Sequence, residues 1–109
     1  MEDCVFCKIV AGQIPGNKVY EDGEVLAFLD IHPKGPGHTL LIPKVHYRWF
    51  EEMPDELYDK VFRTAKKLSL EMKQKGADHV QLGIVGKDVP HVHIHLIPRS
   101  AGQRAASDL

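Results

Sequence analysis

Three histidines stand at every second position in the segment "HVHIHLIPR", residues 91–99. An imidazole can ligate a metal ion, attack an electrophile, or move a proton near neutral pH. Alternate side chains of a β-strand share a face, so His91, His93 and His95 are predicted to project together. The apolar residues between them are then predicted to face the core.

The spacing of these histidines limits what they can do jointly. The rise of a strand separates successive histidines by roughly 6.6 Å and the outer two by roughly 13 Å. A zinc–nitrogen bond is only ~2.1 Å long, so His91 and His95 are not expected to share one ion. Three readings stay open: a polar strip on a solvated strand, a metal site with ligands from elsewhere, or a nucleophile assisted by its neighbours.

The only two cysteines, Cys4 and Cys7, form a C-x-x-C pair in "CVFC". A disulfide across so short a loop would add little stability, and a redox pair usually lies where a strand leads into a helix. The pair is therefore predicted to be half of a metal site that needs ligands from elsewhere in the chain.

Length and composition bound the class of protein. The 109 residues predict one domain at residues 1–99, followed by a mobile tail at residues 100–109, which have no pattern. A net charge of −1, without runs of like charge, argues against long nucleic acids as partners. No apolar run is as long as a membrane span, and the N-terminus lacks a signal-peptide pattern. We therefore expect a cytoplasmic protein without a membrane partner.

Hydrophobic periodicity predicts the elements that position these residues. Strands are predicted at residues 18–22, 25–31, 39–43, 79–85 and 91–97. One long helix is predicted from Pro54 to Lys75. Its buried face is expected to carry Leu57, Val61, Ala65, Leu68 and Met72. Strands, one helix and further strands predict an α+β domain with a mainly antiparallel sheet, in which the third and fifth strands are central.

Four separated blocks of the chain resemble the histidine triad (HIT) superfamily, in its Hint-like branch of small bacterial members. The blocks are "CVFCKIVAGQIP", "KVYED", "VLAFLDIHPKGPGHTLLIPKVH" and "VPHVHIHLIPR", in that order, and they cover nearly the whole chain. The resemblance implies a five-stranded sheet with one long helix and a short N-terminal helix. It also implies a homodimer in which two sheets join into one.

The resemblance implies hydrolysis or transfer of a nucleoside monophosphate through a covalent nucleotidyl-histidine, with purine nucleoside phosphoramidates as substrates. His93 matches the nucleophile, and His95 and His38 match the flanking histidines that contact the phosphate and relay a proton. A neutral imidazole suits this attack, and a partner on its far ring nitrogen would fix its tautomer. The sequence does not identify that partner. His32 and His79 match no such position and are predicted to lie on the surface.

The nucleoside is expected to bind near the first two strands and the N-terminal segment. Asp30 matches the acid that accepts hydrogen bonds from both ribose hydroxyls, which suits a carboxylate with two oxygens. The positions that match contacts to base or ribose are Phe6, Ile9, Ile14, Phe28, Ile31 and Leu40. For Ile9, Ile14 and Leu40, a role in the core is an open alternative.

One loop departs from the pattern of the family. Many relatives carry Asn-x-Gly and then Gly-Gln-Ser/Thr-Val before the triad, whereas this chain reads "VQLGIVGKDVPH". Asp88 stands where Ser is common and would repel a phosphate, while Lys87 would offset part of that charge. Phosphate binding is then expected at the backbone amides from Gly86 to Val89.

The resemblance also completes the metal site. His46 and His91 match the two histidines that bind zinc together with two such cysteines in many bacterial relatives. A Cys2His2 set is closed and tetrahedral, which indicates a structural zinc ion held by Cys4, Cys7, His46 and His91. The alternative is a pair of buried, reduced thiols beside two unrelated histidines.

Three other functions stay open beside the phosphoramidase. One is hydrolysis of dinucleoside polyphosphates, as in the fragile histidine triad branch. Another is a non-catalytic, zinc-stabilised nucleotide-binding protein, for which the altered loop at 87–88 leaves room. The last is a catalytic metal site formed by His91, His93 and His95 together.

Overall fold

The computed structural model describes residues 4–86 and 89–104. Its elements are α1 (Val5–Val10), β1 (Lys18–Glu21), β2 (Val25–Leu29), β3 (Thr39–Pro43), the 3₁₀ helix η1 (Phe50–Glu52), α2 (Asp55–Gln74), β4 (His79–Ile84) and β5 (Ile94–Arg99). The strands form one sheet in the order β1-β2-β3-β5-β4, and every neighbouring pair is antiparallel. The predicted α+β class is confirmed, as are the central third and fifth strands and the short N-terminal helix.

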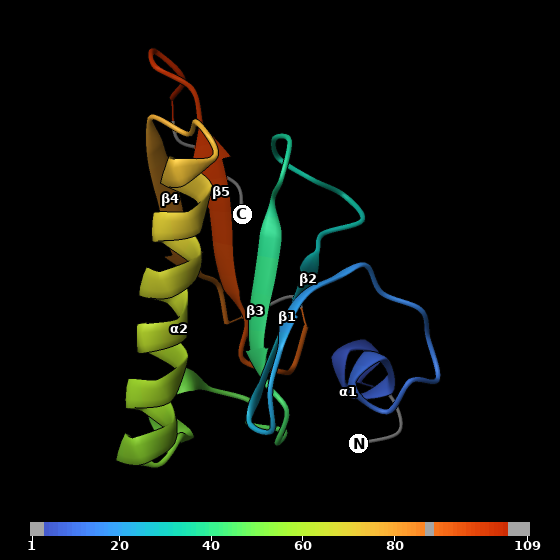
Figure 1. Ribbon diagram of the computed structural model, residues 1–109. Helices are drawn as coiled ribbons and strands as arrows, with labels where there is room; N and C mark the ends of the chain where they lie inside the picture. The colour runs from blue at the N-terminus through green and yellow to red at the C-terminus, as the bar shows by residue number, and fades with distance from the viewer. Residues whose placement is uncertain (1–3, 87–88, 105–109) are drawn as a thin grey trace.

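Both faces of the sheet are covered, by helices of different length. Helix α2 lies along one face, and α1 lies on the side of the strands away from α2 (Figure 1). Alternation along β2 sends Val25 and Ala27 to the α2 side and Leu26 and Phe28 to the α1 side. The central strands are therefore apolar at consecutive positions, which is why β3 is buried throughout.

Helix α2 shows the start and stop that its sequence predicts. Pro54 stands at the N-cap, Asp55 lies in the first turn, and Lys73 lies in the last turn, where its charge complements the helix dipole. Gly76 has a φ of +113°, a left-handed conformation that ends the helix without the strain that a side chain would add. All five residues of the predicted apolar face pack in the core on this side.

The last strand begins later than the sequence pattern predicts. The prediction was 91–97, whereas β5 runs from Ile94 to Arg99. The backbone N–H of His91 donates to the carbonyl of Val89, and that of Val92 donates to the carbonyl of Tyr47. These amides bond outside the ladder with β3, so only His95 of the three histidines lies in a strand. The second strand is also shorter than predicted and ends at Leu29.

The predicted tail is only partly covered by the description. Its first residues form a turn in which the N–H of Gln103 donates to the carbonyl of Ser100. Residues 105–109 lie outside the described residues, so the mobility of the tail stays a prediction. Within residues 4–86 and 89–104, no helix combines the length and the apolar composition needed to cross a membrane.

Candidate functional site

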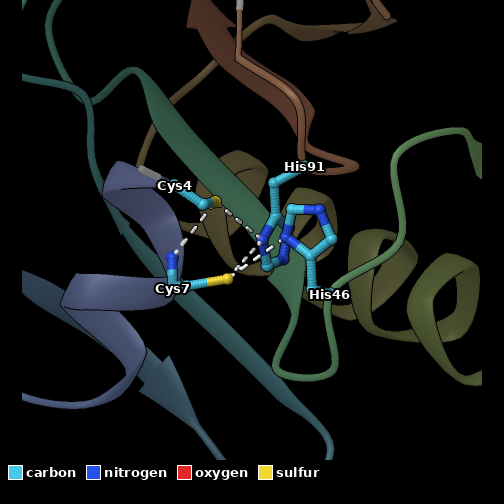
Figure 2. Close-up of side chains that lie close together, drawn as sticks. All are labelled: Cys4, Cys7, His46 and His91. Carbon is cyan, nitrogen blue, oxygen red and sulfur yellow. Dashed lines mark hydrogen bonds between the residues drawn. The ribbon is translucent and has the colours of Figure 1, made fainter. Parts of the chain in front are cut away.

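Two cysteines and two histidines from distant parts of the chain converge on one point (Figure 2). Cys4 and Cys7 come from the start of α1, His46 follows β3, and His91 precedes β5. Their Sγ and ring nitrogen atoms all lie within 4.8 Å of one another. The structure therefore brings together all four residues that the sequence assigns to a metal.

The distances in this group fit a tetrahedral ion. Sγ of Cys4 lies 3.3 Å from Nδ1 of His91, and Sγ of Cys7 lies 3.2 Å from Nδ1 of His46. Zinc with ordinary sulfur and nitrogen bond lengths would place such atoms ~3.6 Å apart. The group thus has the donor set and the size for a metal ion, with small adjustments of the side chains.

Local structure prepares two of the ligands. Sγ of Cys4 caps α1 by accepting the N–H of Cys7 at 3.4 Å, which places both sulfur atoms at the same end of the helix. Nε2 of His91 lies 2.8 Å from the carbonyl of Pro43. Because a carbonyl only accepts, Nε2 carries the proton and Nδ1 directs its lone pair at the sulfur atoms.

Burial shifts two pKa values in this group. Burial lowers the pKa of His91 to about 4, so its imidazole is neutral and able to ligate. Burial, together with the neighbouring Cys4, raises the pKa of the Cys7 thiol to about 11. A metal ion would reverse that rise, because thiolates are the forms that ligate.

The ring of His93 is held by its own backbone neighbourhood. Nδ1 of His93 lies 2.8 Å from the carbonyl oxygen of His91, so Nδ1 donates and the lone pair of the ring is on Nε2. The ring of Phe6 meets it edge-on with centroids 5.1 Å apart. The side chain of His93 is only 5 % exposed, so the histidines do not form a polar strip on a solvated strand. The carbonyl of His91 is the tautomer-fixing partner that the sequence did not identify.

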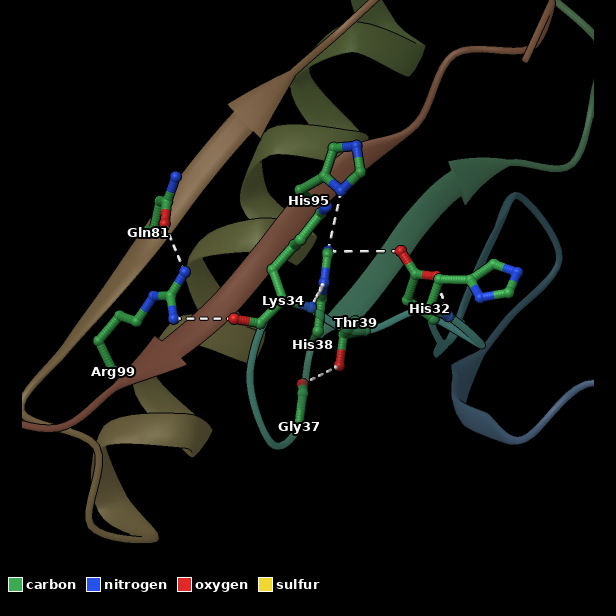
Figure 3. Close-up of polar contacts among 9 residues, drawn as sticks. His32, Lys34, Gly37, His38, Thr39, Gln81, His95 and Arg99 are labelled. Carbon is green, nitrogen blue, oxygen red and sulfur yellow. Dashed lines mark hydrogen bonds and ion pairs between the residues drawn. The ribbon is translucent and has the colours of Figure 1, made fainter. Parts of the chain in front are cut away.

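His38 and His95 form a directed hydrogen-bond chain (Figure 3). The backbone N–H of Lys34 donates to Nδ1 of His38 at 2.9 Å, so the His38 proton is on Nε2. That atom lies 2.9 Å from Nδ1 of His95 and donates to it, which places the His95 proton on Nε2. These two hydrogen bonds fix one tautomer for each ring without any charged imidazole.

Asp30 lies beside this chain. Its Oδ2 is 3.6 Å from Nε2 of His38, and its Oδ1 accepts the backbone N–H of His32 at 2.9 Å. Burial lowers the pKa of His38, although the charge of Asp30 acts in the opposite direction. His38 is therefore neutral at neutral pH, and it acts as a hydrogen-bond donor through Nε2.

Asp30, His38 and His95 also lie close enough to hold an ion by distance alone. A metal on Nε2 of His38 would move the proton to Nδ1, where it would face the N–H of Lys34. Two donors would then point at each other, so this group suits proton transfer better than ligation.

The geometry contradicts a catalytic metal site made by the three triad histidines. Among the described residues, neither of the two groups that could share an ion contains His91, His93 and His95 together. His91 turns to the cysteines, His93 donates to a carbonyl, and His95 bonds to His38. The three rings therefore have three different partners and do not converge on one point.

The residues expected to contact the nucleoside fall into two groups. Those in the apolar cluster beneath α1 are Phe6, Ile9, Phe28 and Leu40, with Ile14 and Val89 packed against it. Ile31 differs, because its side chain is 83 % exposed just beyond β2. Lys87 and Asp88 lie outside the described residues. His32 is exposed and His79 is half-buried beside Asp78 at 2.9 Å, so neither joins the site.

A cavity next to His93 has walls that the sequence did not single out. It has a volume of about 200 Å³ and is bounded by Arg48 and Trp49 on one side and by Ile84 and Gly86 on another. The Arg48 guanidinium stacks 3.9 Å over the Trp49 ring and donates to the carbonyl of Gly86 at 2.6 Å. No motif marks these residues, because their contact depends on how the segment after β3 folds back.

Comparison with known proteins agrees with this geometry. The family model of the HIT domain matches residues 11–102. An uncharacterised HIT-like protein of Methanocaldococcus jannaschii is 46 % identical, over 91 % of this chain and 81 % of its own. The adenosine 5′-monophosphoramidase of Saccharomyces cerevisiae is 41 % identical, over 88 % of this chain and 62 % of its own.

A solved structure shows the same fold. The zinc-bound histidine triad family protein from Mycobacterium smegmatis superposes with a TM-score of 0.90 and 32 % identity, over 97 % of this chain and 81 % of its own. Sequence, fold and site agree, and the chain belongs to the histidine triad family.

Proposed function

We propose that this protein hydrolyses purine nucleoside phosphoramidates through a covalent nucleotidyl-histidine on His93. The observation that carries the proposal is the 2.8 Å contact between Nδ1 of His93 and the carbonyl of His91. With the proton on Nδ1, the neutral tautomer of this ring has its lone pair on Nε2, which is the form that a nucleophile needs. The similarity to a yeast adenosine 5′-monophosphoramidase supports the choice of substrate.

The reaction proceeds in two steps that use His93 twice. Nε2 of His93 attacks the phosphorus, the bond from phosphorus to the amine nitrogen breaks, and the amine leaves with a proton from Nε2 of His95. The negative charge left on the His95 ring is balanced by the positive charge of the nucleotidyl-imidazole of His93, which keeps its Nδ1 proton on the carbonyl of His91. Water then attacks the phosphorus of the nucleotidyl-histidine and gives its proton to His95. Nucleoside monophosphate is released and His93 is restored. His38 supports both steps by its bond to His95.

The nucleotide is held around His93 by a carboxylate, by apolar side chains and by backbone amides, each of which binds a different part of it. Asp30 accepts hydrogen bonds from the ribose hydroxyls, and Phe6, Phe28 and Ile31 contact the base or ribose. The backbone amides from Gly86 to Val89 bind the phosphate. The proximity of Asp30 to His38, at 3.6 Å, supports this arrangement because the ribose and the reacting phosphate are adjacent in a nucleotide.

A zinc ion on Cys4, Cys7, His46 and His91 is part of the proposal. The ion would supply structural cohesion: its ligands tie α1 to the segment before β5, and α1 carries Phe6. The donor set is closed, so the ion leaves the reaction to the histidines. We also propose a cytoplasmic homodimer, the assembly that the resemblance implies.

The test measures release of AMP from adenosine 5′-phosphoramidate by the wild type and by His93→Ala. Loss of the nucleophile is expected to lower kcat by at least ~10³-fold. His79→Ala is the matched control, because this histidine lies away from the site and pairs with Asp78. Diadenosine tetraphosphate is measured in parallel. Quenching in alkaline detergent, which preserves a phosphorus–nitrogen bond, should trap a labelled nucleotide during turnover on the wild-type chain alone.

The outcomes separate the candidate functions. Turnover of the phosphoramidate that vanishes in His93→Ala supports the proposal. Faster turnover of diadenosine tetraphosphate would move the assignment to polyphosphate hydrolysis by the same histidine. Binding of AMP without turnover of either compound would leave only a nucleotide-binding protein.

A further inference from the structure

Arg99, the last residue of β5, is a buried cation with an unusual set of partners. Its side chain is 6 % exposed, and its Nε atom makes no hydrogen bond. Nη1 donates to the carbonyl of Lys34 at 3.0 Å, and Nη2 donates to Oε1 of Gln81 at 3.1 Å. None of the ion pairs found within residues 4–86 and 89–104 involves Arg99. Burying a cation without a carboxylate partner costs free energy, so the position of this guanidinium calls for an explanation.

The guanidinium holds the loop that leads into β3. A Cβ atom added to Gly35 would lie 3.1 Å from Nη1 of Arg99. Gly37 has a φ of +82°, and a Cβ atom there would lie 3.0 Å from Cγ of Pro98. The loop therefore rests directly on Pro98 and Arg99, and glycine is what allows the close approach.

The same loop controls the first link of the histidine chain. The carbonyl of Lys34 accepts from Arg99, while the N–H of Lys34 donates to Nδ1 of His38 (Figure 3). Both backbone groups of one residue are thus bound, one to the cation and one to the ring. We propose that Arg99 is a positioning residue for His38, which keeps the ring in its Nε2–H tautomer through Lys34.

This inference rests on the proposed function, because His38 supports His95 in that reaction. If Lys34 moved, His38 could carry its proton on Nδ1, and its Nε2 lone pair would face Nδ1 of His95 at 2.9 Å. His95 would then turn its own proton toward His38 and lose the donor on Nε2. The tautomer of His38 therefore decides whether His95 can protonate the leaving amine.

Charge acts in the same direction as geometry. The groups that face His38 are Asp30 after β2, Lys34 in its own loop, and His95 and Arg99 on β5. Asp30 favours the imidazolium form, and the two cations oppose it. Removing the charge of Arg99 would leave Asp30 less opposed, so His38 would protonate at a higher pH.

The experiment compares Arg99→Gln and Arg99→Lys with Gln81→Ala as the matched control. Gln81→Ala removes the partner of Nη2 and leaves the contact of Nη1 with Lys34 intact. The ¹⁵N shifts of the His38 ring, measured by NMR without substrate, report its tautomer and protonation. Steady-state kinetics with adenosine 5′-phosphoramidate and urea unfolding are measured on the same samples.

Arg99→Gln is expected to shift His38 toward the Nδ1–H or protonated form and to lower kcat by ~10- to 100-fold, with KM changed less than ~3-fold. The acidic limb of the pH profile of kcat should move to higher pH in Arg99→Gln. Arg99→Lys should recover part of kcat, and Gln81→Ala should keep the wild-type tautomer. Gly35→Ala retains the charge but pushes the loop from Arg99, so it should lower kcat and change the tautomer as well.

A folded Arg99→Gln protein with wild-type His38 shifts would overturn the proposal, even if its stability or kcat fell. Equal changes in the His38 shifts and in kcat for Gln81→Ala and Arg99→Gln would also overturn it, because Arg99 would then act only by joining β4 to β5. Should Arg99→Gln not fold, Arg99→Lys and Gly35→Ala decide by the same shifts. If the wild type cleaves no substrate, the proposed function fails while the NMR comparison still tests the positioning of His38.

Discussion

Nε2 of His38 lies 2.9 Å from Nδ1 of His95, although the two residues are 57 positions apart in the chain. The register of the central strands makes this contact. β3 and β5 are neighbours, with Leu40 opposite His95, so the residue that enters β3 reaches the ring on β5. A directed bond between two neutral imidazoles follows, and its direction is set by the N–H of Lys34.

That direction yields a prediction for two variants of His38. Glutamine places an N–H near the position of Nε2 and can still donate to His95, whereas alanine cannot. His38→Gln should therefore retain at least ~10-fold more kcat than His38→Ala, in measurements of AMP release from adenosine 5′-phosphoramidate. Equal activities would show that the donor on His38 has no part in the reaction. Circular dichroism on both variants controls for folding, because the side chain is fully buried.

Removing the proposed zinc ion should destabilise the protein. The four ligands join α1 to the segments beside β3 and β5, so an ion that binds only the folded state adds to its free energy of unfolding. A contribution of about 2 kcal/mol would correspond to a fall in Tm of about 10 °C on chelation. Calorimetry with and without a strong chelator measures it.

Cys4→Ser is the control for chelation. The variant loses one sulfur ligand, and its Tm should be low and insensitive to chelator. Metal analysis should find close to one zinc ion per wild-type chain. A wild-type Tm that does not respond to chelation, with no metal in the protein, would favour the alternative of two reduced thiols.

Gly86→Ala should disturb the wall of the cavity beside His93. An added Cβ atom would lie 3.0 Å from Cζ3 of Trp49, a ring that is 43 % exposed and therefore able to move outward. Trp49 is the only tryptophan, so its emission reports the movement directly and should shift to longer wavelength. The carbonyl of Gly86 is bound by Arg48 and adjoins the expected phosphate site, so kcat/KM should fall by ~10-fold.

The double variant Trp49→Ala/Gly86→Ala separates the clash from other effects. Without the indole ring, alanine at position 86 has no ring to clash with. Adding Gly86→Ala to Trp49→Ala should therefore lower kcat/KM much less than adding it to the wild type. Additive losses would mean that the glycine is needed for the backbone and not for the space that Trp49 occupies.

The hairpin between β1 and β2 should make stability depend on pH. Oδ2 of Asp22 lies 2.7 Å from Nζ of Lys60, and this contact, with two backbone N–H donors, holds the pKa of Asp22 well below its usual range. The ionised carboxylate thus stabilises the fold above its unfolded pKa of about 3.9, and that contribution is lost as the pH falls further toward the folded pKa.

Asp22→Asn isolates this contribution. The amide oxygen can still accept from Glu24 and Val25, so the variant loses the ion pair with Lys60 and the hydrogen bond from the Tyr20 hydroxyl to the same carboxylate oxygen. Its Tm should be lower than that of the wild type by a few degrees at pH 7, and the difference should shrink below about pH 4. A difference that stays constant down to acid pH would show that the charge of Asp22 is not the cause.

The resemblance to the family rests on distinctive local blocks, which is why it could predict which cysteines and histidines lie close together. Cys4, Cys7, His46 and His91 converge as expected, and the separation of His91 from His95 already followed from the rise of a strand. The sheet was predictable for a similar reason, since its strands are apolar runs bounded by Gly, Pro and Asp.

The backbone partners were not predictable. The carbonyl that fixes His93 depends on residues 91–93 leaving the ladder, and periodicity cannot distinguish a strand from an extended segment that bonds elsewhere. The contacts of Arg99 with Lys34 and of Arg48 with Gly86 join side chains to carbonyls of remote loops, which carry no residue signature. For Ile31 the error runs the other way: the sequence pattern predicts a strand position, whereas β2 ends at Leu29.

The proposed role of Asp30 predicts how the protein discriminates between sugars. If its carboxylate accepts from both ribose hydroxyls, AMP should bind more tightly than 2′,3′-dideoxy-AMP by ~10-fold or more, because a charged hydrogen bond contributes about 1.5–3 kcal/mol. Asp30→Ala should weaken binding of AMP and leave binding of the dideoxy nucleotide nearly unchanged, so that the ratio of dissociation constants approaches one. Calorimetric titration of His93→Ala avoids turnover and measures both ligands. A ratio that survives in Asp30→Ala would place the ribose elsewhere and leave Asp30 to act on His38 alone, across the 3.6 Å between Oδ2 and Nε2.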